Sequence, residues 1–188
     1  MIALYVCIGI VVVVLLSVVV MYNRFVRQRT LVDESWGQID VELTRRHDLI
    51  PNLVKTVQGY ADHERTVLEE LTRAREAAEA HKDDSPARRG PVEDALGNAL
   101  GTVLARAEAY PDLKASANFL QLQHELTNTE DRIAAARRFY NGNVRALNTR
   151  VSTFPSNLIA SMFGFESREF FELTDPAARA VPDVGLSG

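Results

Sequence analysis

The sequence predicts an all-α protein, in which an N-terminal transmembrane helix continues into an antiparallel, up-and-down, four-helix-like bundle of long helices. Three observations predict this class: an apolar run over residues 2–22, a repeat of about 3.5 residues over 24–80, and a second such repeat over 119–154. A repeat of about 3.5 residues keeps one face of a helix against its partners, whereas a strand has a period of about 2. We expect one bundle domain over residues 23–173.

The apolar run from Ile2 to Tyr22 contains no charged residue and no proline. At about 1.5 Å per residue it spans about 32 Å, enough to cross a hydrocarbon core of about 30 Å. A cleaved signal peptide is the alternative, but no basic region precedes the run and no small-x-small cleavage site follows it. A lipoprotein anchored at Cys7 would need small residues before the thiol, where Leu4-Tyr5-Val6 stand. We therefore predict a retained, single membrane span.

Charge predicts the orientation of that span and restricts the partners. Arg24, Arg27 and Arg29 follow the run directly, so the positive-inside rule places the bulk of the chain in the cytoplasm and the N-terminus outside. These arginines are candidate ligands for anionic lipid headgroups. The net charge of −4 argues against a nucleic-acid partner, whose binding surface is basic. Cys7 is the single cysteine, which excludes an intramolecular disulfide and a thiolate zinc site.

The first repeat predicts one long packing helix from Arg24 to Ala80. Pro51 interrupts it: either Asp48 caps a new helix that begins near Pro51, or the proline kinks a continuous helix. The apolar stripe keeps its phase across Pro51, which favours the kink. The stripe comprises Val32, Trp36, Ile39, Leu43, Arg46, Ile50, Leu53, Val57, Tyr60, Glu64, Val67, Leu71, Ala74 and Ala78.

The chain beyond Ala80 supplies the partners of this helix. Residues 81–91 lose all periodicity and predict an exposed turn, with Pro91 in the first turn of the next helix. Tyr110-Pro111 either reverses or only bends the chain. The second repeat then covers the first as an antiparallel neighbour. It comprises Phe119, Leu122, Leu126, Thr129, Ile133, Ala136, Tyr140, Val144, Leu147, Val151 and Phe154.

Residues 156–172 form a short segment rich in aromatic and aliphatic side chains, and such a segment needs burial. Its own bundle is the favoured surface, and a protein partner or the membrane are the alternatives. Residues 174–188 predict a disordered tail. The candidate interaction residues of the segment are Leu158, Ile159, Phe163, Phe165, Phe170 and Phe171.

The feature of the sequence that most resembles a functional site is a polar cluster formed by residues 45–48 and 62–64. Its candidate residues are Arg46, Asp48 and Glu64, which would either fix the register of the helices or contact a partner. Bundles often bury a few paired charges of this kind. Arg46 and Glu64 lie on the stripe but are too far apart on a straight helix to pair with each other. Candidate partners on the second repeat are Glu125, Glu130, Asp131, Arg137 and Arg138.

Motifs that carry reaction chemistry are missing from the sequence. No histidine is preceded by a glutamate at three residues, as di-iron bundles require, and Val67 stands where a zincin that began at His63-Glu64 needs its second histidine. No glycine-rich phosphate loop or recognised nucleophile setting occurs. We predict no catalytic, cofactor-binding or metal-binding residue and no enzyme.

Several unbroken blocks resemble the LemA family of bacterial membrane proteins. The resemblance covers roughly residues 22–171. It implies one N-terminal transmembrane helix in the bacterial cell membrane, a cytoplasmic helical bundle and an uncertain molecular function. The blocks are Tyr22-Asn23, Trp36 to Leu43, Arg45 to Val54, Gly59 to Glu64, Ala74-Arg75, Tyr110 to Ala115, Phe119 to Glu130, Ile133 to Arg137, Tyr140-Asn141 and Phe154 to Ala160.

The favoured functional hypothesis is a membrane-anchored cytoplasmic helical scaffold that binds itself, as a homo-oligomer, or other membrane-associated proteins. A peripheral lipid-sensing or membrane-remodelling protein is the alternative, in which the arginines at 24–29 and the segment at 158–171 contact the leaflet. An enzyme or a metal protein comes third.

Overall fold

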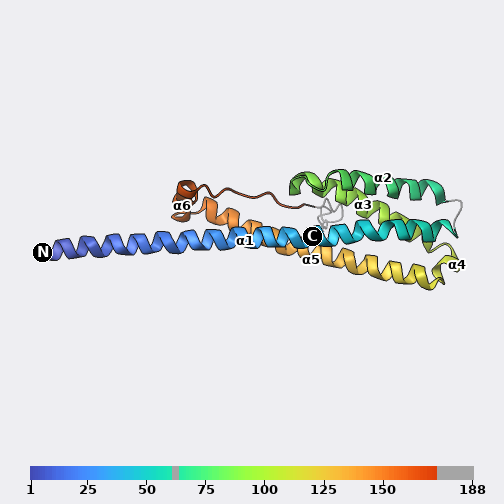
Figure 1. The fold of residues 1–188 in the computed structure, drawn as a ribbon, viewed down its shortest axis with the longest axis horizontal. Helices are drawn as coiled ribbons and strands as arrows, with labels where there is room; N and C mark the ends of the chain where they lie inside the picture. Colours follow the sequence, from blue (N-terminus) through green and yellow to red (C-terminus); the bar gives the residue numbers. More distant parts are fainter. Residues whose placement is uncertain (61–63, 173–188) are drawn as a thin grey trace, which may run out of the picture. The chain divides into compact units, whose positions relative to one another are not determined.

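The computed structural model describes residues 1–60 and 64–172, and this part of the chain is helical with no strand (Figure 1). The predicted all-α class, with a long apolar helix that continues into a bundle, is confirmed. The helices are α1 (Ile2–Gln58), α2 (Arg65–Ala80), α3 (Pro86–Ala107), α4 (Pro111–Lys114), α5 (Ala117–Ser152) and α6 (Ser156–Phe163).

The described residues form two compact units, and both α1 and α5 contribute to each. Unit 1 contains Met1–Leu43 and Asp131–Phe170. Here α1 and α5 run antiparallel, and the two predicted stripes face each other, with the Trp36 and Tyr140 ring centroids 5.4 Å apart. Stripe positions buried in this unit are Val32, Ile39, Leu43, Ile133, Tyr140, Val144 and Leu147.

Beyond α6, an extended segment of unit 1 covers one side of the α1–α5 pair. Gly164 ends α6 in the left-handed conformation (φ 68°), which glycine adopts without a Cβ penalty. Phe165 then stacks on Phe25, with ring centroids 4.7 Å apart. Further along, the Arg168 amide donates to the Asn148 side-chain oxygen at 2.8 Å, and the Tyr140 hydroxyl donates to the Glu169 carbonyl at 2.8 Å. The segment is therefore held to both helices.

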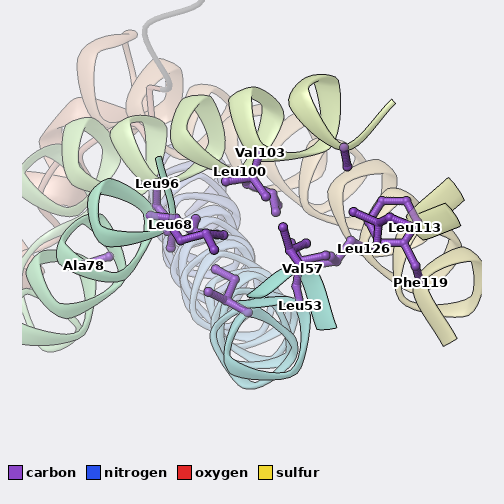
Figure 2. Packing of buried hydrophobic residues seen from close by; sticks show 13 residues of the cluster. Leu53, Val57, Leu68, Ala78, Leu96, Leu100, Val103, Leu113, Phe119 and Leu126 are labelled. Carbon is purple, nitrogen blue, oxygen red and sulfur yellow. The ribbon is translucent and has the colours of Figure 1, made fainter. Parts of the chain in front are cut away.

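Unit 2 contains Thr44–Glu130 and, among the described residues, Phe171 and Glu172. The end of α1, then α2, α3 and the beginning of α5 follow one another up and down (Figure 1). Their apolar side chains meet in one core, with α4 closing one end (Figure 2). The core residues are Ile50, Leu53, Val57, Leu68, Leu71, Ala78, Leu96, Leu100, Val103, Ala107, Leu113, Phe119 and Leu126.

The prediction of one helix from residue 24 to residue 80 is wrong. α1 ends at Gln58, Gly59 and Tyr60 form a turn, and α2 begins at Arg65 and runs antiparallel to the end of α1 within unit 2. The apolar residues keep their spacing of three and four across the break, because α1 and α2 pack on the same core. At the break itself the stripe fails: the Tyr60 side chain is exposed.

One other boundary also differs from the sequence prediction, and two open alternatives are decided. The turn after α2 is shorter than residues 81–91, because Pro86 already occupies the first turn of α3 and Pro91 lies inside this helix. At Pro51 the favoured continuous helix is confirmed, because this proline lies inside α1 and no new helix begins there. At Tyr110-Pro111 the chain reverses through α4 into α5. The tail at 174–188 lies outside the described residues, and the domain limits at 23 and 173 stay predictions.

Candidate functional site

A buried cluster of charged side chains lies in unit 2, at the level of Arg46 on α1. Arg46 is 2% exposed, and its guanidinium donates to both carboxylate oxygens of Glu130 on α5 at 3.1 and 3.2 Å. It also donates to the carboxylate of Glu93 on α3 and, at 3.1 Å, to the carbonyl of the same residue. Arg46 therefore connects three helices through charge-assisted hydrogen bonds.

Glu93 is the centre of this cluster, because its carboxylate is fully buried and receives three cationic side chains. Besides Arg46, it accepts from Arg89 Nε at 3.3 Å, one turn earlier on α3. The third contact is the His47 Nε2, at 3.1 Å, while the His47 Nδ1 lies 3.0 Å from the Glu79 carboxylate on α2. With His47 protonated, the cluster pairs three cations with the three anions Glu79, Glu93 and Glu130, so it carries no net charge.

The pKa values follow from burial and from these contacts. Burial alone raises the pKa of Glu93, but the hydrogen bond from His47 and the charge of Arg46 outweigh it and lower the value to about 2. Burial alone lowers the pKa of His47, and the hydrogen bonds to Glu93 and Glu79 outweigh it, so this pKa is raised. The hydrogen bond from His47 lowers the pKa of Glu79. The two carboxylates thus favour the charged form of His47.

This arrangement can fix the register of the helices, because a buried ion network is costly to shift by one turn. Arg46, His47, Arg89 and Glu93 are buried, whereas the Glu79 and Glu130 side chains are 47% and 39% exposed. In the part of the chain that the structure describes, no group of three or more His, Cys, Asp or Glu side chains is placed to hold a metal ion.

The structure brings together only some of the residues of the predicted polar cluster. Arg46 pairs with Glu130, one of the partners expected on the second stripe. Asp48 is exposed on α1. Glu64 lies off the α1 stripe, beyond the end of that helix, where it precedes α2 and accepts a hydrogen bond from the Tyr110 hydroxyl at 3.0 Å. Asp62 and His63 lie outside the described residues.

Sequence reasoning missed Glu93 and Arg89. Glu93 was not among the candidate residues, and Arg89 fell within the predicted exposed turn. A signal was present, since stepping back from Leu96 by three and then by four residues reaches Glu93 and Arg89. Both therefore lie on the buried face of α3.

A second feature is an open groove in unit 1, on the side of the α1–α5 pair that the segment after α6 leaves uncovered. Helical spacing places Gln38 and Glu42 on the opposite side of α1 from Asp33, which pairs with Arg168 of that segment at 3.5 Å. Phe139 is 53% exposed here. The groove has a volume of about 420 Å³ and is lined by Gln38, Glu42, Arg132, Ala135, Ala136 and Phe139.

The groove contains an unsatisfied polar atom. Glu42 Oε1 lies 3.5 Å from the exposed guanidinium of Arg132, at the limit of a hydrogen bond. Glu42 Oε2 is buried and has no hydrogen-bond partner among the described residues. A buried carboxylate oxygen without a donor is energetically costly.

The candidate residues of the aromatic segment divide into buried and exposed groups. Ile159 and Phe165 are buried in unit 1, Phe171 is buried in unit 2 and Phe170 is half-buried, whereas Leu158 and Phe163 are exposed. Of the arginines that follow the apolar run, Arg24 and Arg27 are exposed, and the Arg29 guanidinium lies 5.7 Å from the centroid of the Phe165 ring.

The model of the LemA family matches residues 35–185 of this chain. Curated relatives include the Magnetosome protein MamQ 2 of Paramagnetospirillum magneticum, which is 27% identical over 181 residues, and the Magnetosome protein MamQ of Magnetospirillum gryphiswaldense, 25% identical over 180. Each alignment covers 80% of this chain and 64% of the relative, so the chain spans less than two thirds of these relatives. Protein LemA of Metamycoplasma hominis is 26% identical over 155 residues, which cover 81% of this chain and 69% of that protein.

The family match covers most of the chain, including both the buried charge cluster and the groove. In the described residues, one helix, α1, is long and apolar enough near the N-terminus to cross a membrane. The apolar helix and the helical units after it agree with the properties that the resemblance implied. The chain therefore belongs to the LemA family and is a membrane-associated helical protein.

Proposed function

We propose that this protein is a membrane-anchored helical scaffold that associates with further copies of itself. In this proposal residues 2–22 form a single membrane span, the N-terminus lies outside and the bulk of the chain is cytoplasmic. The observation that carries the proposal is the groove of unit 1, where no further element of the described residues covers one side of a two-helix pair and Phe139 is exposed.

The chemistry of the groove favours a second copy of the same chain as the occupant. Glu42 lines the groove with a carboxylate whose contact to Arg132 is 3.5 Å long, and the Arg132 side chain is 61% exposed. In a two-fold interface both groups occur twice, so Arg132 of each copy can donate to Glu42 of the other. Ala135 and Ala136 are small and permit close approach of a helix. The two charges and the small side chains of the groove support its pairing with the same groove of a second copy.

The test is the mass of the full chain, gently extracted from its membrane and measured by light scattering with mass spectrometry of the same peak. We expect a homo-oligomer for the wild-type protein. Ala135→Arg should fill the groove and yield monomers. The matched control is Ala105→Arg, because Ala105 is exposed on α3 in unit 2, and this variant should keep the wild-type mass.

A monomeric wild-type protein, or an oligomer that Ala135→Arg leaves intact, would refute self-association through the groove. A foreign chain at a fixed ratio, lost in Ala135→Arg but not in Ala105→Arg, would replace self-association by an adaptor role for the same surface.

A further inference from the structure

Helix α6 exposes large apolar side chains on its outer side. Ile159 and Ala160 are buried in unit 1, but Leu158 and Met162, one turn apart, are 57% and 70% exposed. Ser156–Phe163 contains no charged residue, and Ser161 is its exposed polar residue. A surface helix normally has a polar and charged outer face, so large apolar side chains on that face normally contact protein or lipid. The outer side of α6 therefore requires a cover.

The position of α6 along α1 identifies the environment of this outer side. The Phe163 ring makes an edge contact with the Tyr22 ring, with centroids 5.0 Å apart, and Phe165 makes a similar contact at 5.7 Å. Tyr22 is the last residue of the apolar run of α1. Tyrosine rings are enriched at membrane interfaces, which is where a membrane-spanning apolar run ends. The C-terminal end of α6 thus lies where α1 would leave the bilayer.

The charges next to α6 agree with a phospholipid surface. Arg24, Arg27 and Arg29 are exposed on the turns of α1 that follow Tyr22, at the level of the headgroups if the apolar run spans the hydrocarbon core. Phe154, which precedes α6, is also exposed. An apolar surface with arginines beside it has the composition of interfacial membrane-binding helices.

We propose that α6 lies in the interface of the same leaflet that α1 enters, with Leu158, Met162 and Phe163 among the acyl chains and the arginines on the headgroups. The ligand class is a phospholipid surface. The contact gives unit 1 a second attachment beside α1, and the two attachments together restrict how α1 rotates in the membrane. This inference is independent of the groove and of self-association.

The experiment uses the full chain in nanodiscs that each hold one copy. Cys7→Ser removes the single cysteine, and Met162→Cys or Leu158→Cys then carries an environment-sensitive fluorophore. The control is Arg138→Cys, an exposed position of α5 near the Trp36–Tyr140 contact, about 21 Å along α1 from Tyr22. Lipids with a nitroxide on the acyl chain close to the headgroup serve as the quencher.

We expect several-fold quenching and blue-shifted emission at positions 158 and 162, and neither at position 138. If the fluorophore at positions 158 and 162 is quenched no more than at position 138, the proposal is overturned. A blue shift without lipid quenching would also overturn it, because protein rather than lipid would then cover α6. Both labelled positions are exposed in the structure, so the label itself is not expected to disturb folding.

Discussion

Replacing Arg46 by alanine tests whether the buried charge cluster fixes the helices of unit 2. The change removes two hydrogen bonds to Glu130 and two to Glu93, and leaves Glu93 buried with only His47 and Arg89 as cationic neighbours. Breaking a buried pair by removing one partner costs about 3–5 kcal/mol. Because Glu93 keeps two of its three cations, we expect a loss at the lower end, about 3 kcal/mol.

The assay is the thermal midpoint of the full chain in detergent micelles, followed by circular dichroism at 222 nm. For a chain of this size, about 3 kcal/mol corresponds to a decrease of roughly 6–12 °C. The control is Arg45→Ala, since Arg45 is exposed on the neighbouring position of α1 and surface changes of this kind stay within about 0.5 kcal/mol. Equal midpoints for the two variants would refute the register role.

A second pair of substitutions separates the loss of charge from the loss of packing. Arg46→Met keeps much of the side-chain volume but leaves Glu93 without its main partner, so we expect it to be nearly as destabilising as Arg46→Ala. Combining Arg46→Met with Glu93→Leu removes the buried carboxylate as well, but Arg89 and His47 also contact that carboxylate, so we expect no recovery of stability. A double variant more stable than Arg46→Met would contradict this account.

The remaining predictions concern pH and the backbone of unit 2. Because the folded pKa of His47 lies above 6.5, its contribution is complete below pH 6.5 and is lost as the pH rises through the folded value. Urea titrations of His47→Gln should therefore show a deficit at pH 6 that shrinks towards alkaline pH. The pKa of Glu93 is lowered from 4.5 to about 2, so Glu93→Gln should cost on the order of 3 kcal/mol at pH 7, and the deficit should shrink as the pH falls from 4.5 towards 2. A Cβ at Gly90 would lie 2.4 Å from the Glu172 carbonyl oxygen, so Gly90→Ala should lower the melting midpoint, whereas Gly101→Ala, with open space around it, should stabilise by about 1 kcal/mol. A midpoint unchanged by Gly90→Ala would show that the chain at Glu172 moves aside freely.

The helices and their buried faces were predictable from the sequence, because apolar spacing records which side of a helix is covered. The Arg46–Glu130 pair followed from the same logic, since a charge on a buried stripe needs a partner on the facing stripe. Spacing carries no information on direction, however. Two antiparallel helices that pack on one core can continue the same spacing of apolar residues along the chain. The break after Gln58 was therefore missed, although Gly59 stands next to it.

The groove was not predictable, because it depends on tertiary placement. Which side of the α1–α5 pair stays open is decided by where the segment after α6 crosses the two helices, through hydrogen bonds such as that of Arg168 to Asn148. These contacts join residues 20 positions apart on different elements, and no local pattern encodes them. The split of the aromatic segment into buried Phe165 and exposed Phe163 has the same origin.

The pairing of α1 with α5 has a consequence for biosynthesis. Gln28 donates to the Asn143 carbonyl across 115 residues, and Asp33 meets Arg168 across 135. At about 5–20 residues per second, translation needs roughly 6–25 s to supply these partners. During that interval the stripe of α1 beside the apolar run is uncovered, while the helices of unit 2 emerge in succession. We therefore expect unit 2 to form first, and unit 1 to close last, from a chain that the proposed membrane span already holds at its N-terminal end.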